Sequence, residues 1–141
     1  MKNQEKELEN RIFDILMESE ELIKNGDYER GWELIESSIS LFPEPKYEND
    51  LLYLVVSEMA NYALISNNYS IITKYMNILF ITGLDRADNG ERESLVGKIE
   101  YELGHMETAK QLLKVALAKR KGINYFKGKE NEKYLKLAKE K

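Results

Sequence analysis

Apolar residues recur along this chain at spacings of three, four and seven. Such spacing places them on one face of a helix, whereas a strand would alternate apolar and polar residues. The first stripe shows the pattern and consists of Leu8, Ile12, Ile15, Leu16, Leu22 and Ile23. Both Pro residues, Pro43 and Pro45, fall between stripes, so no predicted helix is interrupted. The chain is therefore predicted to be all-α.

The apolar pattern divides into seven helical segments separated by turn-forming residues. They are expected over Glu5–Lys24, Trp32–Phe42, Asp50–Ile65, Ser70–Ile81, Glu91–Leu103, Glu107–Arg120 and Glu132–Lys139, with a loop over Thr82–Asn89. The third segment is apolar on most of its surface and is predicted to be the most buried. The fourth is rich in β-branched residues, which also suit a strand, but its apolar spacing fits a helix better.

Three of the helix boundaries are alike. A helix is predicted to end at Gly26, at Asn67 and at Gly104, and each turn is followed at once by an aromatic residue or Met that starts the next helix. The turns are 41 and 37 residues apart. Three helical hairpins in series are therefore predicted, each with an apolar face that it buries against its neighbour.

This pattern resembles the tetratricopeptide repeat, in which a G-x-Y/F turn joins two helices that cross at small residues. The first repeat matches at Gly26-Asp27-Tyr28, Gly31, Ser38 and Pro43, and the third at Gly97, Gly104, Met106, Ala109 and Ala116. The second departs from the family, because Ile72 and Leu79 replace the small residues, so its helices are expected farther apart. The resemblance implies one helical domain over residues 1–141, a solenoid of three repeats plus a short C-terminal helix.

The C-terminal residues carry a second resemblance. The pattern Gly122-x-x-x-Phe126-x-Gly128-x-x-x-x-Lys133-Tyr134-Leu135 is similar to the tail of small bacterial tetratricopeptide-like proteins. Many of those are immunity proteins of polymorphic or contact-dependent toxin systems. The resemblance implies that the chain binds a toxin domain, such as a nuclease, and blocks it.

The chain has few of the residue types that usually carry out catalysis. It has no Cys and a single His, His105, which falls in a predicted turn. A thiolate zinc site, a Cys nucleophile and any mechanism that needs two imidazoles are therefore excluded. The carboxylates near Glu20 and Glu100 are interpreted as solvated helix faces, since nothing in the sequence demands a shifted pKa. No catalytic residue, metal site or cofactor is expected, and the protein is not expected to be an enzyme.

Charge is divided unevenly along the chain. Residues 1–66 hold 6 basic and 15 acidic residues, a net charge of −9, whereas residues 109–141 hold 11 basic and 3 acidic residues, a net charge of +8. The acidic half would repel nucleic acid and attract a basic protein. The first helix of each hairpin should line the binding face. We expect that face to include Phe13, Glu20, Ser57, Glu58, Asn61, Ser94, Lys98 and Tyr101.

The expected function is therefore protein binding, most specifically immunity against a cognate toxin that presents a basic surface. Alternatives are a scaffold or secretion-chaperone adaptor that binds a peptide, and an RNA-binding module that uses the basic tail. In that tail the aromatic residues Tyr125, Phe126 and Tyr134 could stack on bases or could dock the tail on the last repeat. No apolar run is long enough to cross a membrane. The protein is expected in the cytoplasm, as a monomer or weak dimer, without a nucleic-acid or membrane partner.

Overall fold

A computed structural model describes residues 2–83 and 89–141, and the prediction of an all-α chain is confirmed for this part of the chain. Residues 84–88 of the predicted loop over 82–89 lie outside the described residues. The α-helices are α1 Lys2–Lys24, α2 Tyr28–Ser37, α3 Asp50–Ile65, α4 Ile78–Ile81, α5 Glu91–Glu102, α6 Met106–Lys119 and α7 Glu132–Lys139. Short 3₁₀ turns lie at Ser38–Leu41, Lys46–Glu48, Ser70–Ile72 (η3) and Lys129–Asn131.

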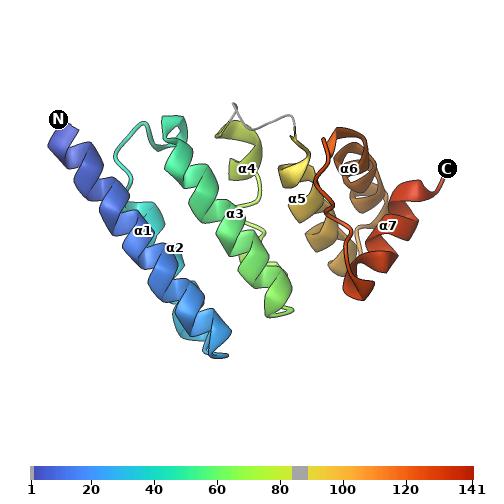
Figure 1. Ribbon diagram of the computed structural model, residues 1–141, viewed down its shortest axis with the longest axis horizontal. Coiled ribbons are helices and arrows are strands. Elements are labelled where there is room, and N and C mark those ends of the chain that lie inside the picture. The colour runs from blue at the N-terminus through green and yellow to red at the C-terminus, as the bar shows by residue number, and fades with distance from the viewer. Residues whose placement is uncertain (1, 84–88) are drawn as a thin grey trace.

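The helices are arranged as hairpins along the long axis of the molecule. Figure 1 shows α1, α3, α5 and α7 following one another from the N-terminal to the C-terminal end. Helix α1 pairs with α2, α5 pairs with α6, and α3 packs against both α1 and α5. None of the described helices has the length and apolar character needed to cross a membrane.

The three predicted turns share one backbone geometry. At each, the second residue after the helix has a positive φ, namely 83° at Gly26, 56° at Asn67 and 87° at Gly104. The next residue donates its N–H to the carbonyl five residues earlier, in the pairs Asp27–Leu22 (2.9 Å), Asn68–Ala63 (3.0 Å) and His105–Glu100 (2.9 Å). This is the Schellman ending, which favours Gly and tolerates Asn. The predicted equivalence of the turns is thus confirmed.

Small residues let the paired helices approach closely. A Cβ atom at Gly31 of α2 would lie 2.8 Å from Ile23 Cδ1 and 3.2 Å from the carbonyl oxygen of Ser19 in α1. A Cβ atom at Gly97 of α5 would lie 2.9 Å from two side-chain carbons of Leu113 in α6. Both separations are shorter than ordinary carbon contacts. These glycines therefore set how near the first and third hairpins can close.

The second hairpin is less regular than predicted. A single helix over Ser70–Ile81 is wrong, because the chain there forms η3, a run of turns and only then the four-residue α4. Several backbone bonds in this stretch span three residues, as from Leu79 N–H to Met76 O (3.1 Å). The β-branched residues Ile71, Ile72 and Thr73 favour a helix weakly. Ile72 and Leu79 are both 0% exposed, so their burial, rather than helix propensity, determines the backbone path here.

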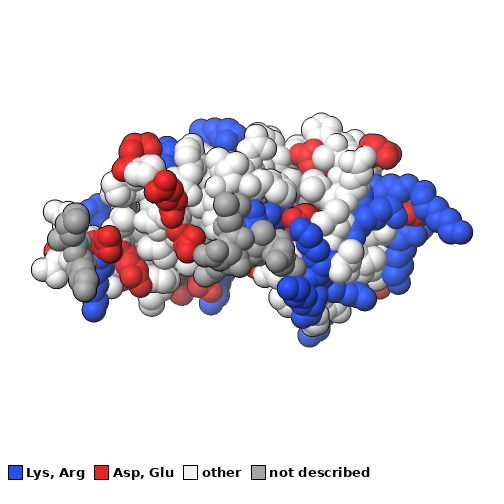
Figure 2. Space-filling model, turned by 90° about the horizontal axis from the view of Figure 1, so that it is seen from above, with Lys and Arg blue, Asp and Glu red and all other residues white. Residues whose placement is uncertain are grey.

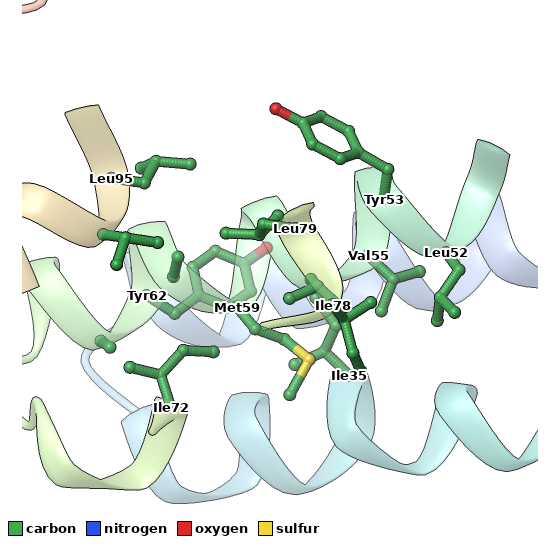
Figure 3. Close-up of a cluster of buried hydrophobic side chains, with 14 of the residues drawn as sticks. Ile35, Leu52, Tyr53, Val55, Met59, Tyr62, Ile72, Ile78, Leu79 and Leu95 are labelled. Carbon is green, nitrogen blue, oxygen red and sulfur yellow. The ribbon is translucent and has the colours of Figure 1, made fainter. Parts of the chain in front are cut away.

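The core is centred on α3, as predicted from its apolar surface. Nine of its sixteen residues are buried. Figure 3 shows Met59 of α3 extending toward Ile35 of α2, in a cluster that also includes Ile72 and Ile78 of the second hairpin. A second, smaller cluster joins α6 to the C-terminal segment, defined here as residues 121–141. It consists of Leu113, Ala116, Phe126, Tyr134 and Ala138.

Candidate protein-binding face

Carboxylates from three helices interact across α1, α3 and α5. The acidic face is defined here by Glu20 of α1, Glu58 of α3 and Glu91 of α5. Burial raises the pKa of the Glu58 carboxyl above its ordinary value of 4.5, and the negative charges of Glu20 and Glu91 raise it further. A side-chain hydrogen bond with Asn61 acts in the opposite direction. The ionised form of Glu58 is therefore disfavoured by burial and by the charges of Glu20 and Glu91.

Local contacts hold this face in place. The Ser19 and Tyr62 hydroxyls are 3.3 Å apart and join α1 to α3. The Tyr53 hydroxyl donates to Glu91 Oε1 at 2.8 Å, which ties the start of α5 to α3. These contacts link the three helices that carry the acidic face, and the second one positions the Glu91 carboxylate.

Exposed apolar side chains lie beside Glu20 on α1. Phe13 is 41% exposed and Met17 is 69% exposed. Residues 13, 17 and 20 are spaced four and three apart and therefore share one side of the helix. Glu20 itself pairs with Lys24 at 3.2 Å in an exposed ion pair, which contributes little to stability. Met17 is not among the predicted binding residues, although its position four residues after Phe13 indicates the same side of the helix.

Two of the predicted binding residues lie inside the protein. Ser57 is 5% exposed and donates its hydroxyl to the carbonyl of Leu54 at 2.8 Å. Ser94 is 2% exposed. Both are flanked by buried residues of their own helices, so neither side chain presents a surface to a partner. Phe13, Glu20, Glu58 and Asn61 are at least partly exposed and lie on neighbouring helices.

The C-terminal segment covers Lys98 and Tyr101 of α5. The Lys98 ammonium donates to the carbonyl of Tyr125 at 2.5 Å and lies 5.8 and 5.6 Å from the ring centres of Phe126 and Tyr134. Burial lowers the pKa of Lys98. Tyr101 meets Tyr134 edge to face, with ring centres 5.1 Å apart. Lys98 and Tyr101 therefore contact this chain's own C-terminal segment and are only partly exposed.

Polar contacts fasten the same segment. Glu102 accepts from the Tyr134 hydroxyl at 2.9 Å and pairs with Lys133. The pKa of Tyr134 is raised, first by burial and then by the hydrogen bond to Glu102. Phe126 and Tyr134 are 5% and 6% exposed, so their rings offer no stacking surface for a base. Docking on the last hairpin, one of the two interpretations of these aromatic residues, is what the structure shows.

The surface charge follows the unequal division of the sequence. Figure 2 shows Lys and Arg gathered over the C-terminal end of the molecule, with Asp and Glu more frequent toward the N-terminal end. The described residues hold no group of three or more His, Cys, Asp or Glu that could bind a metal ion. His105, in an exposed turn, lies 2.9 Å from a Glu100 carboxylate oxygen.

No protein-family model, curated protein or solved structure matches the chain. The features of the molecule that bear on its function are the acidic face, the adjoining apolar side chains of α1 and the C-terminal segment packed on the third hairpin.

Proposed function

We propose that the chain is a protein-binding domain of tetratricopeptide-like architecture whose acidic face receives a basic surface of another protein. The observation that carries this proposal is Glu58. Burial, and to a smaller extent the negative charges of Glu20 and Glu91, disfavours its ionised carboxylate in the free protein, and a Lys or Arg from a partner would offset that cost. Phe13 and Met17 add an apolar contact next to the charges, which is the mixture found at the centre of many interfaces.

The C-terminal segment packs on the third hairpin and so restricts the surface that is open to a partner. With Lys98 and Tyr101 in contact with the C-terminal segment, the predicted binding residues most open to a partner are those of α1 and α3. A short preformed surface favours one shape-matched protein over many extended peptides. This favours a specific inhibitor over a scaffold or chaperone adaptor that accepts several peptides.

We further propose, from the resemblance of the C-terminal segment, that the partner is a bacterial toxin domain and that the chain is its immunity protein. Nucleases that act on DNA or RNA present basic surfaces to phosphates. An acidic protein bound there would block access of the nucleic acid sterically and electrostatically. The described residues of this chain would supply no catalytic step.

Co-expression tests this function. The protein encoded beside this chain in its genome would be expressed alone and with the chain. Growth is expected to stop with the neighbouring protein alone and to recover with the wild-type chain. The double variant Glu20→Gln/Glu58→Gln should protect less well.

A matched control has the same change in net charge. Glu7 and Glu18 are exposed and lie eleven residues apart on a side of α1 turned away from Glu20. The variant Glu7→Gln/Glu18→Gln should protect as well as the wild type. Arrested growth despite expression of the folded wild-type chain would contradict the proposal.

A further inference from the structure

A groove lies between α2 and the turn region of the second hairpin. Its volume is about 560 Å³, within the usual range for ligand sites. Ile23 and Ile71 give it an apolar lining, and Tyr28 and Trp32 of α2 also border it. Neither Glu20 nor Glu58 lines this groove, which is bordered on the α3 side by Tyr62 and Ser66.

Ser66, Asn68 and Ile71, around the turn that joins α3 to η3, form one wall of this groove. Ile71 is partly exposed and lines the groove together with Trp32, whereas Ile72 is buried. An apolar surface is thus left open next to an aromatic side chain.

Three carboxylates of α2 line the same groove. Glu29, Glu33 and Glu36 are spaced four and three apart and so share one side of the helix. Glu36 accepts from the Tyr75 hydroxyl at 2.6 Å and pairs with Lys74 at 3.5 Å. Glu29 and Glu33 have no hydrogen bond or ion pair with any residue in the described ranges 2–83 and 89–141. Two like charges four residues apart repel one another, and a bound cation would remove that repulsion.

The aromatic residues of the groove indicate which cationic group it would bind best. Tyr28 is 42% exposed and Trp32 is half-buried, and they lie four residues apart on α2. A planar guanidinium can stack on such rings while its N–H groups donate to neighbouring carboxylates. A Lys ammonium is a compact, strongly hydrated charge and uses the flat surface less well. We propose that this groove binds an arginine side chain presented by a segment of another protein, as a contact additional to the acidic face.

The single Trp of the chain makes this proposal directly measurable. The wild-type protein would be titrated with an acetylated and amidated tri-arginine peptide while Trp32 fluorescence is recorded. A saturable change is expected, with a weaker response to the matching tri-lysine peptide. Glu29→Gln/Glu33→Gln should raise the Kd of the tri-arginine peptide at least tenfold. Because both side chains are exposed, this variant should retain the circular dichroism spectrum of the wild type.

A control variant separates this groove from general surface charge. Glu7→Gln/Glu18→Gln removes the same number of negative charges and should bind the tri-arginine peptide with the wild-type Kd. Equal weakening in this variant and in Glu29→Gln/Glu33→Gln would mean that net charge alone attracts the peptide, and would overturn the proposal. An unsaturable titration, or equal affinity for tri-arginine and tri-lysine, would also overturn it. Failure of the toxin experiment would leave these results unaffected.

Discussion

Substitution of Gly97 tests the packing that positions the binding face. An Ala Cβ there would lie 2.9 Å from Leu113, about 0.6 Å inside the distance at which carbon contacts become favourable. Overpacking of a core costs about 1–3 kcal/mol, and replacing a helical Gly by Ala returns about 1 kcal/mol. We therefore expect Gly97→Ala to lower the free energy of unfolding by up to about 2 kcal/mol.

Gly97→Leu is the stronger test, because three further carbons would have to enter the contact between α5 and α6. The expected loss is about 3 kcal/mol or more, which corresponds to a decrease in Tm of about 10 °C for a chain of this length. Thermal melting by circular dichroism measures it. Thr108→Leu, at an exposed position of α6, serves as the control and should stay within about 0.5 kcal/mol of wild type. A wild-type Tm for Gly97→Leu would refute the close-approach argument.

Three further predictions follow from other contacts. Burial raises the pKa of Glu58 in the folded state, so the free energy of unfolding falls as pH rises from 4.5 through the raised pKa. Glu58→Gln should therefore increase Tm at pH 7 and have little effect on Tm at pH 4. An equal effect at both pH values would contradict this prediction. Phe126→Ala should cost about 3 kcal/mol locally, and hydrogen exchange should accelerate in residues 121–141 but not in α3. Gly31→Ala should destabilise the first hairpin, since the Ser19 carbonyl that its Cβ would meet cannot rotate away; an unchanged urea midpoint would count against that contact.

Local signals in the sequence predicted most of the fold. The predicted bounds Asp50–Ile65 and Glu132–Lys139 coincide with α3 and α7, because Asn49 accepts from the Leu51 N–H as an N-cap and the apolar pattern continues to the end of each helix. The segment over Ser70–Ile81 was mispredicted, since its apolar spacing is helical while its β-branched residues favour a helix only weakly.

The candidate site was less predictable than the fold. Helical spacing placed Glu20 and Glu58 on first helices, but it could not show that Glu91 approaches Glu58, because that depends on how α3 packs against α5. The burial of Ser57 and Ser94 likewise depends on neighbouring helices. Lys98 contacts Tyr125 and Phe126, which lie far from it in the sequence, so helical spacing could not predict these contacts. The composition of the C-terminal segment indicated only that it has aromatic side chains able to dock.

The proposed role of the acidic face is tested most directly by calorimetry at low and high salt. The partner in this titration is the purified protein encoded beside this chain in its genome. The wild-type chain should bind it, with a Kd that rises as salt is added. Glu20→Gln/Glu58→Gln should raise the Kd at least tenfold at low salt and reduce its dependence on salt, whereas Glu7→Gln/Glu18→Gln should change neither by more than about twofold. An unchanged Kd for Glu20→Gln/Glu58→Gln would show that the partner does not bind the acidic face.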